Sequence, residues 1–178
     1  MKALLTTSLF VLFTISSFAQ KPLEYSFNLP FEIQKKRNFE KTTTAWLQQQ
    51  NLQITKVEND TIWATGNISF NNTVVYQASK TYNRIYREQS NGQIVFKMKL
   101  YMKDHHVEAN LNQFKHRPKM KFDNLDFGVI TDNPKAPQNV VAMTDEAYSA
   151  DVWNLLKQKI NNYTNQIKGG TNNMVLAE

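Results

Sequence analysis

Three histidines are the side chains best suited by type to ligate a metal or to transfer a proton near neutral pH. They are His105, His106 and His116, and imidazole both titrates close to neutrality and binds metals through either ring nitrogen. Adjacent His105 and His106 would point to opposite faces of a strand, so a shared metal would require a turn there. No Glu-x-x-His or His-x-x-x-His spacing accompanies them. We therefore expect no metal site and no cofactor.

Motifs for nucleophilic catalysis and phosphate binding are also missing. The chain has no cysteine and five glycines, which removes thiol chemistry and cysteine-built zinc sites and leaves no glycine-rich loop for a phosphate. No Gly-x-Ser-x-Gly elbow is present. Asp123 and Asp126 lie in an irregular stretch and Glu108 lies among lysines, without a marked partner. We expect no enzymatic activity, and a small hydrolase using residues 112–143 is the least favoured alternative.

Basic and aromatic side chains alternate along two segments that we predict to be strands. Interleaved cations and aromatic rings are what nucleic-acid-binding sheets use to neutralise phosphates and stack bases, and the same set suits acidic glycans. A solvated sheet face with cross-strand Tyr–Lys packing is the simpler alternative. The pattern predicts one ligand face made of Lys80, Tyr82, Arg84, Tyr86, Lys97, Lys99, Tyr101 and Lys103.

The excess positive charge is concentrated in the middle of the chain. The formal net charge is +6, and between Lys80 and Lys121 ten Lys and Arg residues face three acids. Such a segment indicates an anionic partner, for which we consider an anionic polysaccharide, a lipid head group or an envelope protein. Lysines also keep sheet faces soluble, so the charge by itself does not establish binding.

The N-terminus predicts export. Lys2 precedes the short apolar run Leu9–Ile15, and the small residues Ser17 and Ala19 precede Gln20. This is the pattern of a secretory signal peptide cleaved between Ala19 and Gln20. Hydroxyl side chains interrupt the run, which falls short of the roughly 20 apolar residues of a membrane span. Without cysteine there is also no lipidation site of a bacterial lipoprotein. We expect a periplasmic or secreted protein of a Gram-negative envelope, which argues against a nucleic-acid partner.

The predicted elements are strands followed by a long irregular stretch and a helix. A helix is predicted over residues 35–50, because Phe39, Thr43, Trp46 and Leu47 form one stripe. A second helix is predicted from Thr144, taken as its N-cap, to the glycines at 169–170. Alternating apolar residues predict strands over residues 23–29, 52–57, 62–70, 73–89, 93–103 and 107–111.

These elements predict an α+β fold, a two-layer sandwich in which two helices cover one face of an antiparallel sheet of about five strands. The predicted order is β-α-β-β-β-β-loop-α. Residues 1–19 would be the signal peptide, 20–170 a single domain with an irregular loop or insertion at 112–143, and 171–178 a flexible tail.

The same residues resemble a domain-of-unknown-function family from secreted proteins of Gram-negative bacteria, with a fold like that of the TATA-box-binding protein (TBP-like). The matching pieces are the helical segment Phe39–Leu47, the strand Ile62–Gly66, the stretch Phe96–Phe114 and a C-terminal helix bearing Trp153. Where the family commonly has glycine after Lys-Asp in a turn, this chain has His105. The resemblance implies a fold and a compartment but no catalytic residues and no DNA binding.

Overall fold

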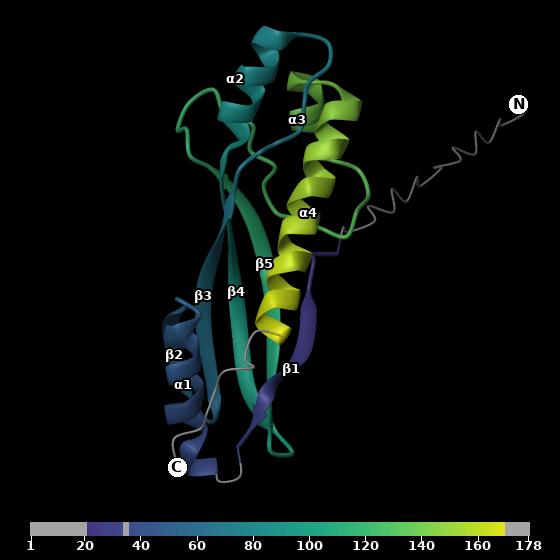
Figure 1. The fold of residues 1–178 in the computed structure, drawn as a ribbon. Helices are drawn as coiled ribbons and strands as arrows, with labels where there is room; N and C mark the ends of the chain where they lie inside the picture. The colour runs from purple at the N-terminus through teal and green to yellow at the C-terminus, as the bar shows by residue number, and fades with distance from the viewer. Residues whose placement is uncertain (1–20, 34–35, 170–178) are drawn as a thin grey trace, which may run out of the picture.

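The computed structural model describes residues 21–33 and 36–169 (Figure 1). The predicted signal peptide, its cleavage point between Ala19 and Gln20, and the predicted tail lie outside the described residues. In chain order the elements are β1 (Tyr25–Glu32), a 3-10 turn η1 (Lys36–Asn38), α1 (Phe39–Gln49), β2 (Gln53–Glu58), β3 (Thr61–Phe70), α2 (Lys80–Ser90), β4 (Gly92–Lys103), β5 (His106–Pro118), α3 (Gln138–Met143) and α4 (Glu146–Gly169).

A five-stranded antiparallel sheet forms the body of the molecule. Its strand order is β1-β5-β4-β3-β2, so β1 closes one edge beside β5, and β2 closes the other. The predicted α+β class and antiparallel sheet are confirmed. β1 runs past Pro30, where the strand prediction had ended it, and its register with β5 shifts between Asn28 and Glu32. Proline has no N–H to donate, and an irregularity in an edge strand is where a sheet tolerates it.

Alternation along β4 separates a buried face from an open one. Ile94, Phe96, Met98 and Leu100 are at most 2% exposed, whereas Lys97, Lys99 and Lys103 between and beyond them are exposed. Successive side chains of a strand point to opposite faces, so the apolar set meets the helices and the lysines meet solvent. Burying each large apolar side chain contributes about 1.5–3 kcal/mol, which strongly specifies this register.

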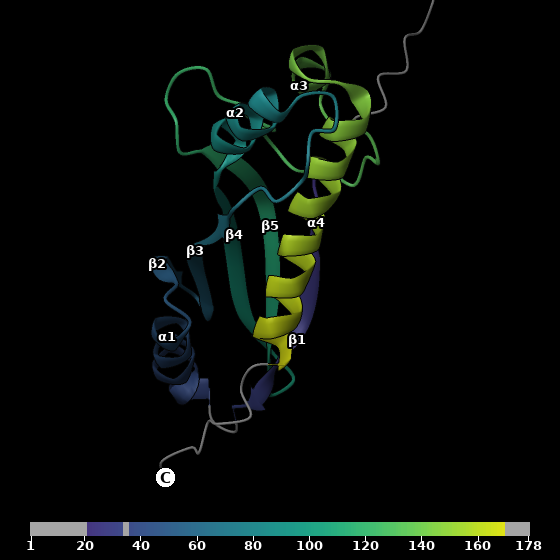
Figure 2. The ribbon, with the colours of Figure 1, turned by 45° about the horizontal axis from the view of Figure 1, so that its top comes forward.

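Two helices cover the buried face, as predicted. α4 packs on β1 and β3, and α1 packs on β2 (Figures 1 and 2). The predicted stripe of α1 points inward, with Trp46 and Leu47 fully buried, and Val152 and Leu156 of α4 are fully buried as well. After α1 the chain turns at Asn51, whose φ of 55° is left-handed, and the Leu52 N–H donates to Leu47 O over 2.9 Å.

The predicted strand over residues 73–89 is wrong, because its second half forms α2. Ser79 caps this helix, its Oγ accepting from the Tyr82 N–H over 3.4 Å. Lys80, Tyr82, Arg84 and Tyr86 do alternate, but Tyr82, Ile85, Tyr86 and Gln89 also recur at spacings of three and four, and that helical period prevails. α2 and α3 are additional to the two helices that the sequence predicted, and both lie at the same end of the sheet (Figures 1 and 2).

Much of the predicted irregular stretch at 112–143 is ordered. β5 continues through Pro118, and α3 occupies its end. Residues 127–130 form an isolated bridge beside β5: the His116 N–H donates to Gly128 O, and the Ile130 N–H donates to Phe114 O, each over 2.8 Å. Leu125, Phe127 and Ile130 are fully or almost fully buried there. The alternation of Leu125 and Phe127 breaks after Gly128, whose φ is 63°, so that Val129 is exposed and Ile130 is buried.

The structure adds detail to the prediction at the start of α4 and in the β4–β5 turn. α4 begins at Glu146, and its cap is Asp145 rather than Thr144, because Asp145 Oδ1 accepts from the Tyr148 N–H over 2.7 Å. In the β4–β5 turn Asp104 and His105 have φ of 48° and 68°, so His105 takes the left-handed conformation that glycine favours. In residues 21–33 and 36–169 no helix has both the length and the apolar content to cross a membrane.

Candidate ligand-binding face of the sheet

The open face of the sheet is a surface on which the strand register lines up basic, aromatic and amide side chains. One row crosses all five strands: Lys56 lies opposite Trp63, Trp63 opposite Lys99, Lys99 opposite Asn110, and Asn110 opposite Ser26. Directly opposite residues of antiparallel strands have Cβ atoms about 4.5–5.5 Å apart. The row therefore forms one continuous strip on the side away from α1 and α4.

Two lysines lie over aromatic rings on this face. Lys56 Nζ is 5.1 Å from the centre of the Trp63 ring, and Lys99 Nζ is 5.5 Å from the centre of the Tyr101 ring. Both distances are within the range of a cation–π interaction. Each ring thus presents an apolar surface beside a positive charge, a combination that suits a ligand with both flat apolar faces and anionic groups.

Acidic side chains neutralise part of the face but leave its centre positive. Lys56 pairs with Glu58, and Lys103 Nζ lies 3.7 Å from Glu108. Lys97 and Lys99 have no ion pair with any acid in the part of the chain that the structure describes. We name the surface formed by Lys56, Trp63, Lys97, Lys99 and Tyr101 the central patch.

A polar ladder borders the central patch on the β5 side. Asn112 Nδ2 donates to Asn110 Oδ1 over 2.6 Å, and Asn110 Nδ2 donates to Ser26 Oγ over 3.0 Å and to Glu24. Beside it, a hydrogen bond to Glu108 raises the pKa of Tyr101, with burial and the negative charge of Glu108 adding to the effect. Tyr101 therefore stays a neutral phenol at physiological pH.

The predicted eight-residue ligand face is divided between two places. Lys97, Lys99, Tyr101 and Lys103 lie on β4, on the open face, as predicted. Lys80, Tyr82, Arg84 and Tyr86 lie on α2 at the end of the sheet and do not extend that face.

On α2 the predicted residues make contacts of their own. Tyr82 and Tyr86 stack with ring centres 5.6 Å apart, and the Tyr86 hydroxyl donates to Met143 O over 3.1 Å. Burial raises the pKa of Tyr86, with the nearby Tyr76, Tyr82 and Asp145 adding to it. Arg84 lies 3.8 Å from Glu88 one turn along the helix. The hydrogen bond of Tyr86 joins α2 to α3, and the other two contacts lie within α2.

Two members of the central patch, Lys56 and Trp63, are absent from the ligand face predicted from the sequence. Trp63 alternates with the buried Ile62 and Ala64, a signal that places it on the outer face of β3. Its position opposite Lys99 could not be read from the chain, because that neighbour depends on the register between β3 and β4.

The three histidines do not come together. His105 and His106 lie at the β4–β5 turn, whereas His116 is fully buried near the other end of β5. His116 Nε2 donates to Ser90 O over 2.9 Å, and its Nδ1 accepts from the Phe127 N–H over 3.3 Å. Within residues 21–33 and 36–169 no group of three or more histidine, aspartate or glutamate side chains could hold a metal ion.

His116 belongs to a buried polar network that joins distant segments. Asn72 Nδ2 donates to Ser90 Oγ and to the Tyr148 hydroxyl, each over 2.7 Å, and Ser90 O accepts from His116. Asp126 Oδ1 lies 3.7 Å from His116 Nδ1, at the far side of the ring. Because Ser90 Oγ donates to Tyr86 O and not to the imidazole, the arrangement is not that of an activated nucleophile.

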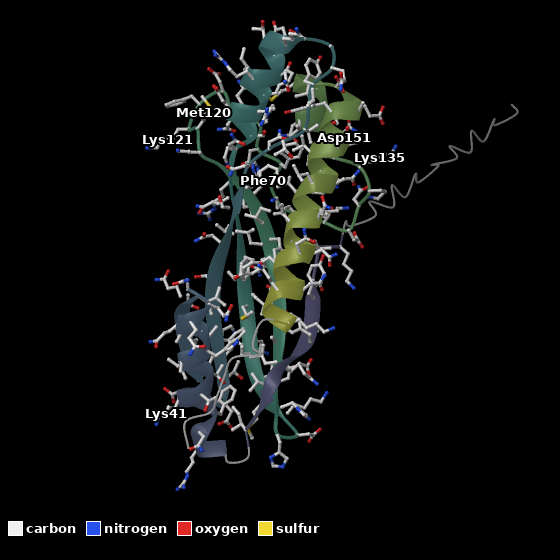
Figure 3. All side chains as sticks on the ribbon, in the orientation of Figure 1. Lys41, Phe70, Met120, Lys121, Lys135 and Asp151 are labelled. Atoms are coloured by element: carbon white, nitrogen blue, oxygen red, sulfur yellow. The ribbon has the colours of Figure 1, made fainter. Side chains whose placement is uncertain are left out.

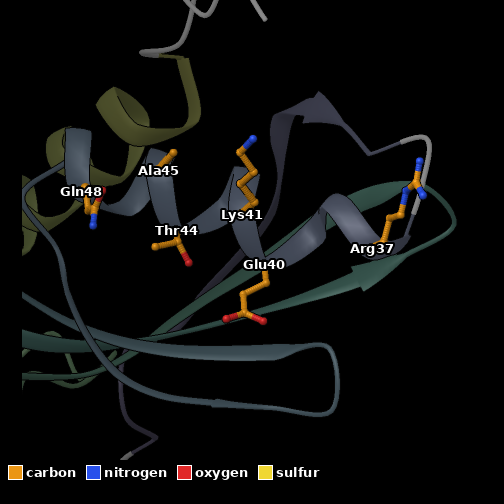
Figure 4. Close-up of a pocket in the computed structure, with 6 residues that line it drawn as sticks. All are labelled: Arg37, Glu40, Lys41, Thr44, Ala45 and Gln48. Atoms are coloured by element: carbon orange, nitrogen blue, oxygen red, sulfur yellow. The ribbon is translucent and has the colours of Figure 1, made fainter. Parts of the chain in front are cut away.

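Three hollows on the surface carry little convergent chemistry. One of about 470 Å³ follows the outer side of α1, where Glu40 and Lys41 point away from each other (Figure 4). One of about 570 Å³ is lined in part by Phe127 and Asp126, and one of about 160 Å³ is lined in part by Glu146. No two carboxylates line the same one of these three hollows.

No protein-family model matches the chain, and no curated protein gives a significant match. Similar solved structures include a TBP-like protein from Parabacteroides distasonis, with 15% identity over 81% of this chain and 94% of that chain and a TM-score of 0.43. Another is a DUF4468 family protein from Bacteroides ovatus, with 11% identity over 79% and 83% and a TM-score of 0.32. Their descriptions agree with the resemblance seen in the sequence, to a TBP-like domain of unknown function. Neither description states a ligand or an activity, so the function is inferred from the residues of this chain.

Proposed function

We propose that the protein is an exported, non-catalytic binding module of the cell envelope that takes an anionic glycan on the open face of its sheet. The observation that carries the proposal is the row Lys56–Trp63–Lys99 with Tyr101 beside it, where lysines and aromatic rings lie in mutual contact on an uncovered surface. A face that served solubility alone would not require partly exposed aromatic rings at its centre.

The chemistry of the central patch fits an acidic polysaccharide. Trp63 and Tyr101 offer rings against which the apolar face of a sugar can pack, while Lys97 and Lys99 can pair with carboxylate or sulfate groups. The amides of Asn110 and Asn112 border the patch and supply donors and acceptors for sugar hydroxyls. Exposed ion pairs are weak and screened by salt, so binding of this kind requires several of them at once.

Retention on immobilised heparin and polygalacturonate tests this proposal. The wild-type protein should be retained at low salt and released as salt rises, because charge pairing supplies much of the attraction. Lys97→Glu with Lys99→Glu should abolish retention. Trp63→Ala should weaken binding about tenfold while leaving the salt dependence nearly unchanged, since it removes a ring and no charge.

A matched control distinguishes binding through the open face from an effect of the net charge of the protein. Lys159→Glu with Lys168→Glu changes two exposed lysines of α4, on the other side of the sheet, by the same charge. This variant should be retained like the wild type. If both double variants lost retention equally, the interaction would be unspecific attraction between opposite charges. If Lys97→Glu with Lys99→Glu lost no retention, the protein would be a structural module whose open face is merely solvated.

Export is the second part of the proposal, and it rests on the sequence pattern that ends at Ala19. Expression of the full chain in a Gram-negative host should give a periplasmic or extracellular product whose mass corresponds to a chain beginning at Gln20. An unprocessed chain recovered from the cytoplasm would contradict export, and would leave the glycan measurements unaffected.

A further inference from the structure

A loop at one end of the molecule exposes two apolar side chains between lysines. We name residues 119–124 the tip loop; it leaves the end of β5 and lies beside α2, where Met120 and Lys121 are labelled in Figure 3. Phe122 is 81% exposed, the highest value among the exposed large apolar side chains, and Met120 is 43% exposed. Leaving a phenylalanine in water forfeits the free energy that its burial would provide, so its exposure calls for an explanation.

Hydrogen bonds at both ends of the tip loop and inside it hold the loop in the conformation that exposes Phe122. The Lys119 N–H donates to Asn91 O over 2.7 Å, and the Leu125 N–H donates to Gln89 O over 3.1 Å, which fastens both ends to the end of α2. Inside the loop, Asn124 Nδ2 donates to Met120 O and to Lys121 O. Leu125 is fully buried directly after it. The fold therefore anchors one apolar residue and presents another.

The charges around these apolar side chains are strongly of one sign. Lys119 and Lys121 alternate with Met120 and Phe122, and Lys115 and Arg117 precede them on the exposed side of β5. Asp123 is the one acid between residues 115 and 124. Glu88, the one acid of α2, pairs with Arg84, and Asp126 lies beside His116. Apolar side chains surrounded by cationic ones are complementary to a surface that is anionic outside and apolar just beneath.

We propose that the tip loop attaches the protein to an anionic lipid membrane. Phe122 and Met120 enter the boundary between head groups and acyl chains, while Lys119, Lys121 and Arg117 contact the anionic head groups. Peripheral proteins combine modest apolar insertion with basic residues in this way, because neither contribution alone holds a protein on a bilayer. This site is separate from the central patch, which lies on the open face of the sheet and not at its end.

Other exposed apolar side chains belong to the same end of the molecule. Tyr82 of α2 is 53% exposed and Met143 at the end of α3 is 49% exposed, and α2 and α3 both lie at that end (Figures 1 and 2). The end distal from the β4–β5 turn therefore carries these two apolar side chains in addition to the tip loop. A membrane would be approached end-on, with the long axis of the sheet pointing away from it.

Vesicle binding tests the proposal directly. The exported protein should sediment with vesicles containing phosphatidylglycerol and not with vesicles of phosphatidylcholine alone. Phe122→Ser with Met120→Ser should weaken binding at least about tenfold, the cost of losing one inserted aromatic side chain. Lys119→Glu with Lys121→Glu should weaken it about fivefold or more for each lysine. Val57→Ser, which removes an exposed apolar residue of β2, and the Lys159→Glu, Lys168→Glu pair should bind like the wild type.

A local probe distinguishes insertion from attraction at a distance. The chain has no cysteine, so Phe122→Cys accepts a single environment-sensitive fluorophore, whose emission should shift to the blue on phosphatidylglycerol vesicles. The same label at Val57→Cys should not shift. Unchanged binding of the Phe122→Ser, Met120→Ser variant, or an unshifted probe on bound protein, would overturn the proposal. If only the Lys97→Glu, Lys99→Glu variant lost vesicle binding, the membrane would bind to the open face of the sheet, and the proposal would also be overturned.

Discussion

At the scale of single residues, His116 makes the stability of the fold depend on pH. Burial lowers the pKa of His116 from 6.5, although the hydrogen bond to Ser90 O and the nearby Asp126 oppose the change. The neutral ring satisfies both of its neighbours, because Nε2 donates to Ser90 and Nδ1 accepts from Phe127. A proton on Nδ1 would face the Phe127 N–H, so protonation is disfavoured until the region opens.

The sign of the effect follows from proton binding. Below about pH 6.5 the unfolded chain takes up a proton at this histidine that the folded chain does not bind, so the contribution of His116 is complete above that pH and is lost as pH falls towards its lowered pKa. The denaturant concentration at the midpoint of unfolding should therefore decrease as the pH is lowered from 7 to 5. His116→Gln, whose amide can donate and accept in place of the ring, should flatten this dependence. His105→Asn, an exposed position, should leave it intact, and an equally steep dependence in His116→Gln would show that other groups cause it.

At the scale of elements, the start of α4 is fixed by one carboxylate. Asp145 Oδ1 accepts from the Tyr148 N–H over 2.7 Å and places a negative charge at the helix N-terminus. Asp145→Ala should lower the free energy of unfolding by about 1 kcal/mol, measured by urea denaturation at pH 7. Asp145→Asn keeps the acceptor and should lose only a fraction of that. Identical losses in both variants would mean that charge, and not the hydrogen bond, is what α4 requires.

The elements that could be predicted from the sequence are those in which burial against the core requires a regular repeat of apolar side chains. β4 alternates over its whole length because one face is buried, and α4 repeats Val152, Leu156 and Ile160 at helical spacing for the same reason. α2 lies at the end of the sheet with Ser90 as its buried residue, so burial in the core does not select between the two periods that Lys80 to Tyr86 fit. Residues 125–130 alternate only briefly, because the positive φ of Gly128 shifts the next buried side chain from Val129 to Ile130.

The candidate site was predictable to the extent that it lies on one strand. Lys97, Lys99 and Tyr101 share a face because side chains alternate along β4, and this required no knowledge of the neighbours. Trp63 and Lys56 join them through cross-strand register, which depends on packing over the whole sheet. The four predicted residues of α2 were misplaced for the same reason that α2 itself was mistaken for a strand.

At the scale of the whole molecule, the two proposed surfaces point in different directions. The central patch lies on the open side of the sheet, and the tip loop lies at the end where α2 and α3 gather (Figures 1 and 3). A protein attached through the tip loop would keep the open face free for a glycan above the membrane. Each interaction should therefore survive loss of the other, and a variant lacking the lysines of the tip loop should still bind polygalacturonate.

The central claim, that a glycan covers the open face, can be followed through one tryptophan. Of the three tryptophans, Trp46 and Trp153 are at most 1% exposed, whereas Trp63 is partly exposed within the central patch. Quenching of tryptophan emission by acrylamide should therefore report mainly on Trp63. Adding polygalacturonate should lower the quenching constant, and Lys97→Glu with Lys99→Glu should remove that protection. Unchanged quenching of the wild-type protein at polysaccharide concentrations that bind it would contradict the account.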